Sequence, residues 1–390
     1  MATVRAFRNK EPNVNPPVLA ILTVDNNKRS FLGNRANFID IINKGRSMGF
    51  IVYVLTVKNL ILGRSHLKGF IFDEENNKWQ RENLPFPNVI YNRIPQREHE
   101  KEPAVRAKLK ACRDYPNLFL FNPYYFNKWR LYKWLNKSEK TMSLVPNTRR
   151  LISIEVLDRM LQKHANLYLK PVSGKAGNGI MTVAYRTEKT LPYRLKIQLN
   201  KKSSTYYCST MRKLWLKIQN QRNREAYIVQ QAIKLASYQD RSYDLRALVQ
   251  KNKYGKWELS GLGARLAGAR SITTHVPRGG QIEEPEKLLR YSFDDEHSVN
   301  ILADVKSTAL RVARQIERGS GRKLGEMSMD LGVDIEGNIW IFEANAKPMK
   351  FDEPQIRQKS LERIFQYSHY LMNKKSKEVA EASVSRNKTY

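Results

Sequence analysis

The 390-residue sequence predicts a fold of the α/β (α+β) class. Two apolar runs, 18–24 and 50–57, flank a helical pattern at 37–47, which gives the order strand, helix, strand. From 166 to 264 the pattern changes to a series of strands. A long helical pattern at 299–318 then precedes two final strands. The length and this change of pattern predict two or three structural units.

The first third of the chain is predicted to form a small α/β unit with parallel strands, because of its strand–helix–strand order. Further strands are predicted at 88–94 and 118–121, with charged helical sequence at 106–112 between them. A helix at 128–135 follows, and a turn at 145–148 leads out of it.

The rest of the chain begins with a predicted helix at 154–164 and continues mainly in strands. Five strands are predicted, at 166–170, 180–185, 227–231, 243–250 and 257–264. The last two, 327–334 and 339–343, are joined by a turn at 335–338. Residues 373–390, rich in Lys, Ser, Glu and Asn, are predicted to form a flexible tail.

Composition excludes several classes of protein. The chain is 41% hydrophobic, which is enough for a substantial core. Its apolar runs are far shorter than the roughly 20 residues of a membrane span, and its N-terminus lacks the apolar stretch of a secretory signal. We therefore expect a cytoplasmic protein with no membrane span. The two cysteines, Cys112 and Cys208, lie far apart and have no zinc-ligand spacing with any histidine.

The formal net charge of +32 is the strongest anomaly of the composition. Such a charge raises the affinity for any polyanion through counterion release. Part of it lies in 186–224, where basic residues meet almost no acids. Nucleic acid, an acidic polymer, an anionic surface and a phosphorylated cofactor are all candidate partners. A solvated, solubilising surface would have the same composition.

A glycine-rich loop follows the strand that ends at Lys170. The loop contains Gly174, Gly177 and Gly179, which permit positive φ and close approach of backbone N–H groups to phosphate oxygens. A bare turn between two strands would need no ligand. The loop has neither the GxxxxGK[ST] pattern nor the strand–loop–helix setting of a dinucleotide site, and its lysine precedes the glycines, unlike that of a protein kinase.

Two acids and an amide form the second candidate site. If the turn at 335–338 folds the last strands into a hairpin, Asp330 and Glu343 come from adjacent antiparallel strands and project onto one face. Together with Asn345 they are hard oxygen ligands suited to Mg²⁺. Neighbouring acids on a hairpin can also be simple surface residues.

Two arginines lie within predicted strands. A buried charge is costly unless it is paired, so we expect Arg246 and Arg265 to face a carboxylate or a phosphate. A purely structural salt bridge from Arg246 to Asp244 or Asp330 is the alternative.

In their order along the chain, these segments resemble the ATP-grasp superfamily from about 128 to 348. The whole chain, including 88–95 and 121–129, is similar to the YheC/YheD type, a group described as endospore coat-associated. The resemblance implies a pre-ATP-grasp α/β domain at 1–125, a first lobe with a small mobile lid at 126–232, a C-terminal lobe with the metal site at 233–372, and the tail at 373–390.

The resemblance also implies roles for individual residues. Nucleotide contacts are expected from Lys128, Lys170, Ser173, Gly174, Lys175, Gly177, Gly179, Gln230, Gln231, Ala232 and Ile233. Many relatives carry glutamate where this chain has Gln230 and Gln231. Catalytic roles on the transferred phosphate or acyl phosphate fall to Arg246, Arg265 and Lys170. Two Mg²⁺ ions, or Mn²⁺, would bind Asp330, Glu343 and Asn345. Arg93, Arg278, Gly279 and Gly280 are weaker candidates for substrate contacts.

The activity implied is that of an ATP-dependent carboxylate–amine or carboxylate–thiol ligase. It would act through an acyl phosphate, release ADP and phosphate, and modify a peptide, protein or acidic polymer linked to the spore coat. The location implied is the cytoplasm of a sporulating bacterial cell, or the coat. One alternative is a catalytically retired relative that serves as a structural coat component or polyanion-binding module. Nucleic-acid binding is a further alternative that rests on charge alone.

Overall fold

The computed structural model describes residues 15–28, 30–174, 177–198, 203–222, 225–268, 274, 280–351 and 353–386. The chain divides into two compact units. The first consists of Met1–Tyr124, Asn252–Gly255 and Leu361–Tyr390, and the second of Tyr125–Lys251 and Lys256–Ser360. The predicted domain start at residue 126 lies one residue after the second unit begins. No helix in the described ranges is both long and apolar enough to cross a membrane.

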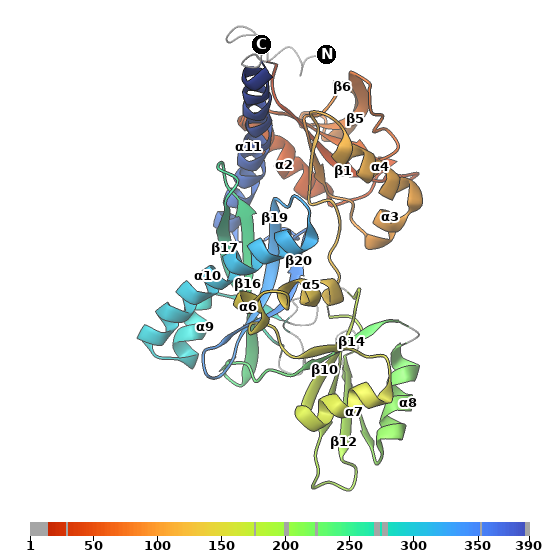
Figure 1. The fold of residues 1–390 in the computed structure, drawn as a ribbon, viewed down its shortest axis with the longest axis vertical. Helices are drawn as coiled ribbons and strands as arrows, with labels where there is room; N and C mark the ends of the chain where they lie inside the picture. The colour runs from red at the N-terminus through yellow and green to blue at the C-terminus, as the bar shows by residue number, and fades with distance from the viewer. Residues whose placement is uncertain are drawn as a thin grey trace. The chain divides into compact units, whose positions relative to one another are not determined.

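The first unit is built on a six-stranded sheet of order β6-β5-β4-β1-β7-β8 (Figure 1). Its strands are β1 (Val18–Thr23), β4 (Ile51–Thr56), β5 (His66–Asp73), β6 (Lys78–Pro85), β7 (Val89–Asn92) and β8 (Phe119–Phe121). The pairs β1–β4, β1–β7 and β7–β8 are parallel, which confirms the predicted parallel unit. The hairpin β5–β6 was not predicted, because β6 is a mostly polar and exposed edge strand.

Helices cover both faces of this sheet. They are α2 (Arg35–Ser47), α3 (Arg97–Lys101), α4 (Pro103–Asp114) and part of α11 (Pro354–Arg386), and a short hairpin of β2 (Asp25–Asn26) and β3 (Ser30–Phe31) precedes α2. One core joins the sheet to α2 and α11, and the other joins it to α4. The alternation of β1 accounts for both cores, because Leu19 and Ile21 enter one and Ala20 and Leu22 enter the other.

The C-terminal helix differs from the prediction in two respects. Its backbone is helical to Arg386, although the sequence predicts a flexible tail from residue 373. From Leu361 onward it belongs to the first unit, although the sequence groups 233–372 in one lobe. The physical reason is apolar packing: Phe365 is fully buried, with its ring centroid 5.0 Å from that of Phe50. Gly45 allows this approach, since a Cβ there would lie 2.6 Å from the Phe365 ring.

The second unit contains an antiparallel sheet of order β13-β12-β11-β10-β14-β9. Its strands are β9 (Thr148–Arg150), β10 (Asn166–Pro171), β11 (Met181–Tyr185), β12 (Tyr193–Gln198), β13 (Ser203–Cys208) and β14 (Tyr227–Gln231). Leu167 and Leu169 point to the face that α7 (Ile154–Lys163) and α8 (Met211–Arg222) cover. The alternate positions Tyr168 and Lys170 therefore point to the opposite face.

The basic segment 186–224 contains two of these strands and helix α8. Its apolar positions are buried in the core of this sheet, among them Leu195, Ile197, Leu214 and Ile218. The spacing of these apolar residues is hard to recognise in the sequence, because long basic side chains occupy the positions between them that face solvent.

A second antiparallel sheet in this unit has the order β18-β17-β16-β19-β20, and β15 also pairs with β16. Its strands are β15 (Ser237–Tyr238), β16 (Arg241–Lys251), β17 (Trp257–Leu266), β18 (Gln281–Glu283), β19 (Glu326–Val333) and β20 (Ile339–Asn345). The predicted final hairpin is confirmed, since β19 and β20 are antiparallel and pair Asp330 with Glu343.

In the described residues, the helices that accompany this sheet are α5 (Lys128–Leu135), α6 (Glu139–Met142), α9 (Pro285–Ser292) and α10 (Asp295–Ser320). Helix α10 contacts β16, β17, β19 and β20 (Figure 1). The Asp294 side chain caps its N-terminus by accepting from the His297 N–H, and Gly321 ends it in the left-handed conformation, with φ of 61°.

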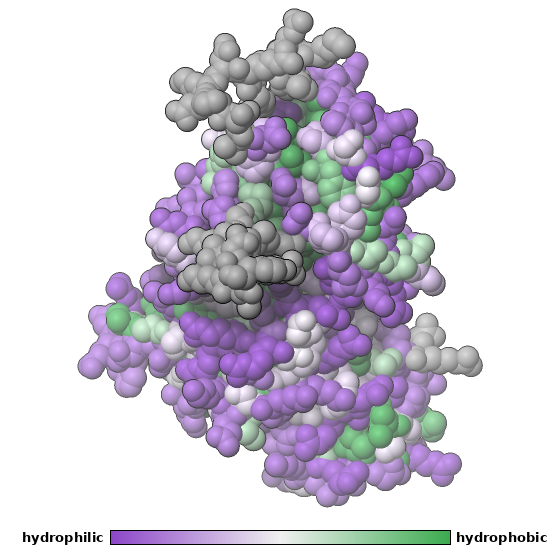
Figure 2. Space-filling view, turned by 45° about the horizontal axis from the view of Figure 1, so that its top comes forward, coloured by the Kyte–Doolittle hydropathy of each residue, from purple (hydrophilic) through white to green (hydrophobic). Residues whose placement is uncertain are grey.

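The visible surface is mainly hydrophilic. On the face shown in Figure 2, purple residues predominate and hydrophobic residues, in green, form separate groups. This distribution agrees with a chain that has 69 Lys and Arg residues against 37 Asp and Glu.

The packing of α11 leads to a stability prediction. Phe365→Ala should destabilise the first unit by about 3–5 kcal/mol, because it leaves a cavity beside Phe50 and α2. Hydrogen exchange of the β1 and β4 amides in denaturant measures this loss. Asn373→Ala, an exposed change on the same helix, should stay within about 0.5 kcal/mol. Equal protection in both variants would show that α11 does not stabilise this sheet.

Candidate active site

One face of the second sheet gathers the predicted polar residues. Asp244 on β16 pairs with Arg265 on β17, and Arg246 pairs with Asp330 on β19. Asp330 in turn pairs with Glu343 on β20. Side chains at paired positions of adjacent strands point to the same side, so these five residues share one face. The backbone register, set by apolar residues at the alternate positions, therefore brings together charges from four strands.

A pocket lies over this face, and residues of both sheets of the second unit line it. The predicted residues that line it are Lys128, Lys170, Gly174, Gly177, Gln230, Gln231, Ile233, Asp330 and Glu343. It therefore joins the glycine-rich loop of one sheet to the acids of the other.

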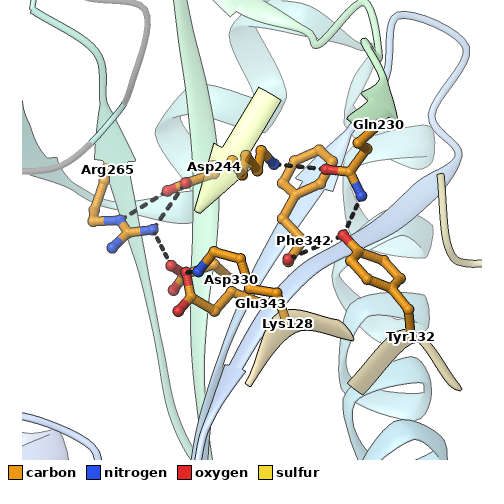
Figure 3. Close-up of polar contacts among 9 residues, drawn as sticks. Lys128, Tyr132, Gln230, Asp244, Arg265, Asp330, Phe342 and Glu343 are labelled. Carbon is orange, nitrogen blue, oxygen red and sulfur yellow. Dashed lines mark hydrogen bonds and ion pairs between the residues drawn. The ribbon is translucent and has the colours of Figure 1, made fainter. Parts of the chain in front are cut away.

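Gln230 lies at the centre of a hydrogen-bond network (Figure 3). Its Oε1 accepts from Lys170 Nζ at 2.6 Å, and its Nε2 donates to Thr148 Oγ1 at 3.0 Å and to the Tyr132 hydroxyl. Tyr132 donates onward to the Phe342 carbonyl at 3.4 Å. Because Nε2 has two oxygen acceptors, the amide oxygen of Gln230 is the atom turned toward Lys170.

The environment of Lys170 favours its neutral form. Burial is the largest cause, and the nearby Lys128 ammonium adds repulsion, so that the pKa of Lys170 falls to about 8. The carboxylates of Glu343, Asp330 and Asp244 act in the opposite direction. The ammonium also lies 5.2 Å from the ring centroid of Phe342. Since Gln230 is neutral, its contact with Lys170 brings no compensating negative charge.

Lys128 neutralises Glu343, one of the three predicted metal ligands. It is the first residue of α5, after the capping residue Asn127, and its N–H donates to the Val172 carbonyl at 3.2 Å. Its buried Nζ lies 2.9 Å from Glu343 Oε2. A capped helix terminus and a main-chain hydrogen bond thus hold this ammonium next to the carboxylate.

Arg265 neutralises the other acids. Its Nε and one terminal nitrogen bind the Asp244 carboxylate at 2.9 and 2.8 Å, and the same terminal nitrogen lies 2.8 Å from Asp330 Oδ2. Burial opposes the charged form of Arg265, but Asp330 and Asp244 outweigh it and raise its pKa. Burial raises the pKa of Asp244, while Arg265 lowers it and Asp330 raises it further. The Thr274 hydroxyl also donates to Asp244.

This geometry differs from the expected roles of the two arginines. Arg265, expected to hold a phosphate, is bound to Asp244 and Asp330. Arg246, for which a bridge to either acid was the structural alternative, forms no ion pair within the described part of the chain. Its guanidinium lies over the Phe351 ring, 4.6 Å from the centroid. Arg246 is therefore the arginine on this face that remains available for an anionic ligand.

The glycine-rich loop has the predicted backbone conformation at two positions. Gly177 and Gly179 both have φ of 70°, whereas Gly174 does not have positive φ. The Tyr227 hydroxyl donates to the Gly179 carbonyl at 2.8 Å and holds this end of the loop. Ser173 lies in the turn before the loop, and Lys175 lies outside the described residues.

At the end of β14, fewer backbone N–H groups are available to bind a nucleotide than the resemblance implies. The Gln231 N–H donates to the Asn147 carbonyl at 2.9 Å, and the Ala232 N–H donates to the Asn166 carbonyl at 3.0 Å. Ile233 lines the pocket, and its N–H donates to no described group. Ile233 is therefore the residue of this segment whose N–H can bind a ligand.

The acids suit a hard cation bound together with a phosphorylated ligand. Asp330 and Glu343 come from paired positions and line the same pocket. Asn345 lies two residues beyond Glu343, pairs with Ser328, and is outside the pocket lining. The described residues contain no group of three or more His, Cys, Asp or Glu that could hold a metal ion. Mg²⁺ fits such a donor set, because it completes its octahedral shell with water and phosphate oxygens.

The remaining predicted residues lie elsewhere. Arg93 belongs to the first unit, where its guanidinium lies over the Tyr91 ring. Arg278 and Gly279 fall outside the described residues, and Gly280 immediately precedes β18. Sequence reasoning missed Tyr132 and Tyr168, although their spacing points to them. Tyr132 is four residues after Lys128 on a helix, and Tyr168 is two residues before Lys170 on a strand.

Comparisons with known proteins identify relatives of this chain. A family model described as YheC/D like ATP-grasp matches residues 117–371. The endospore coat-associated protein YheD of Bacillus subtilis (strain 168) is 27% identical over 353 residues, which cover 89% of this chain and 76% of YheD. The endospore coat-associated protein YheC of the same strain is 21% identical over 284 residues, or 72% of this chain and 76% of YheC.

Solved structures share the fold. The ATP-grasp ligase PsnB, complexed with minimal precursor, has a TM-score of 0.51 at 12% identity, and the match covers 90% of this chain and all of PsnB. The VanG D-Ala:D-Ser ligase from Enterococcus faecalis has a TM-score of 0.50 at 10% identity, with 91% of this chain and all of VanG covered. At these identities the likeness shows the fold alone.

The ion pairs of Arg265 lead to a stability prediction. Arg265→Ala should cost about 3–5 kcal/mol of unfolding free energy, because it leaves two neighbouring carboxylates buried without a cation. Urea unfolding measures the loss. The matched control is Arg290→Ala, which removes the exposed pair with Asp295 and should cost about 0.5 kcal/mol or less. Similar midpoints for the two variants would contradict a structural role for Arg265.

Proposed function

Because this chain belongs to the YheC/D-like ATP-grasp family, we propose that it is an ATP-dependent ligase that joins a carboxylate to an amine or a thiol. The observation that carries the proposal is the pocket. It combines two lysines, a glycine-rich loop and two adjacent carboxylates, Asp330 and Glu343. A module that only binds a partner has no need of this combination.

The proposed nucleotide site uses groups from both sheets. Lys128 and Lys170 supply positive charge for the phosphates, and the loop N–H groups near Gly177 and Gly179 cover them. The Ile233 N–H faces the adenine edge. Asp330 and Glu343 would hold Mg²⁺, with Asn345 as a further oxygen donor once the pocket is filled. When bound, Mg²⁺ supplies positive charge that neutralises the transferring phosphoryl group.

The proposed reaction has two steps. An oxygen of the substrate carboxylate attacks the γ-phosphorus of ATP, and the bond from that phosphorus to the β,γ-bridging oxygen breaks, which gives an acyl phosphate and ADP. The amine or thiol then attacks the carbonyl carbon, loses a proton and displaces phosphate. Arg246 and Lys170 would stabilise the phosphoryl oxygens in both steps, so the protein needs no covalent nucleophile.

For the substrate, we propose a carboxylate borne by a peptide, protein or acidic polymer of the spore coat. The coat-associated relatives support this class, and so does the net charge of +32, which favours an acidic partner. A protein with this role would act in the cytoplasm of the sporulating cell or at the coat.

The first test is ADP formation from ATP and Mg²⁺ with acidic peptides as acceptors. Glu343→Gln and Lys170→Met should each lower turnover by about 100-fold or more, because the first removes a proposed Mg²⁺ ligand and the second removes a positive charge next to the transferring phosphoryl group. Glu336→Gln, at an exposed acid in the turn of the same hairpin, should retain it. Absence of nucleotide binding in the wild type would favour the alternative of a retired ATP-grasp protein in the coat.

A second prediction concerns pH. A bound phosphate raises the pKa of Lys170 above its free value of about 8, so nucleotide binding takes up a proton there. The contribution of Lys170 to affinity is fully present below pH 8 and declines as pH rises through the pKa of the bound state. Calorimetric titration with a non-hydrolysable ATP analogue from pH 7 to 10 should show this decline. Lys170→Arg, which stays charged, should bind with a flat profile, and a decline in both proteins would exclude Lys170 as the cause.

A further inference from the structure

A second hollow in the second unit lies at the C-terminal end of α10. Its lining residues are Arg314, Glu317, Arg318, Gly321, Arg322 and Lys323. Glu317, the acid among them, is already engaged: Lys251 Nζ lies 2.6 Å from its Oε1, and Trp257 Nε1 donates to its Oε2 at 2.9 Å. The hollow therefore has a large excess of positive charge.

The arginine side chains of the hollow do not stabilise the described part of the fold through polar contacts. The guanidinium groups of Arg314, Arg318 and Arg322 are exposed and form no hydrogen bond or ion pair with described residues. Arg314 and Arg318 are one turn apart, a spacing at which like charges repel. The negative end of the helix dipole favours a cation in the last turn, but it does not account for four cations around one hollow.

Two basic stripes lie on α10 and α5, and the stripe on α10 includes Arg314 and Arg318 of the hollow. On α10, Arg311, Arg314 and Arg318 have the spacing i, i+3, i+7, which places them on one face of the helix. The same spacing recurs in and just after α5, at Arg130, Lys133 and Lys137. All six side chains are exposed.

The two helices are in direct contact. Gln315 Nε2 donates to the Trp134 carbonyl at 2.7 Å, and a Cβ at Gly319 would lie 2.7 Å from the Trp134 ring. Figure 1 shows α5 and α6 beside α10. The stripes on α5 and α10 thus lie on two helices that pack against each other.

Helix α5 connects this surface to the pocket. Its first residue, Lys128, lines the pocket, whereas Trp134 packs against α10 next to the hollow. The six residue steps from Lys128 to Trp134 span about 9 Å of helix. An extended peptide covers that distance with about three residues.

We propose that the hollow at the end of α10, together with the two stripes, is a docking surface for an acidic polypeptide whose carboxylate reaches the pocket. The inference rests on the proposed ligase function and adds how its substrate is recognised. An arginine guanidinium can bind a carboxylate through two parallel hydrogen bonds, and a row of arginines therefore suits closely spaced Asp and Glu residues. An acidic polypeptide fits better than a nucleic acid, because only the polypeptide provides the carboxylate that the reaction consumes.

Charge reversal tests this surface. Fluorescence anisotropy of a labelled ten-residue glutamate peptide measures affinity for the full-length protein without ATP. Arg314→Glu with Arg318→Glu should weaken binding by about tenfold or more, since two attractions become repulsions. Lys133→Glu with Lys137→Glu should also weaken it. The matched control, Lys213→Glu with Lys217→Glu, changes the same charge at exposed i, i+4 positions of α8 and should change affinity by about twofold or less.

Other outcomes would overturn the inference. Equal losses in the α10 variant and the α8 control would show that net charge alone attracts the peptide. Unchanged affinity in the α10 variant would exclude the hollow. Tighter binding of a DNA duplex than of the peptide, weakened by the α10 changes, would assign the surface to nucleic acid. Because the assay contains no ATP, it is independent of turnover, and Mg²⁺-dependent ADP formation with a small carboxylate should be equal in the α10 variant and the wild type.

Discussion

The arrangement of the pocket depends on neutralising its buried and half-buried carboxylates. Asp244, Asp330 and Glu343 lie on one face of a single sheet, and such a cluster would be strongly destabilising alone. Arg265 and Lys128 supply the opposite charges from β17 and α5, at distances of 2.8 and 2.9 Å. These pairs fix the positions of the acids and tie α5 to the sheet. A metal ion bound to Asp330 and Glu343 would have to share them with these cations.

The network around Gln230 links the two sheets of the second unit. Gln230 lies on β14, receives a hydrogen bond from Lys170 of β10, and donates to Tyr132 of α5, which reaches the Phe342 carbonyl of β20. Because Gln230 is an amide and not a carboxylate, the network holds the Lys170 side chain in place without neutralising its charge. Burial and the Lys128 ammonium therefore still lower the pKa of Lys170, and an incoming phosphate would supply the negative charge that this lysine lacks.

The basic residues of the chain include two groups with different surroundings. Lys128 and Arg265 are buried next to acids, and Lys170 is half-buried in the pocket, so the geometry of these cations is fixed. The cations along α5 and α10 are exposed, and α10 retains its fold through Val305, Val312 and Ile316 on the opposite side. Exposed charges of this kind cost little stability, so they are free to serve recognition.

The sequence by itself determined many of the local elements and suggested several residues of the candidate site. Apolar runs and alternation located β1, β4, β10, β14 and the hairpin of β19 and β20, because strand and helix periods fix which side chains share a face. The glycine-rich loop after Lys170 and the acids of the last hairpin pointed to Lys170, Asp330 and Glu343 as candidates, and the family resemblance added Lys128. The tertiary structure decided the partners. It placed Arg265 rather than Arg246 against the acids, brought Phe365 from the chain's end into the first core, and joined the basic stripes of α5 and α10. Such contacts link residues distant in sequence, and they depend on how elements pack, which no local pattern encodes.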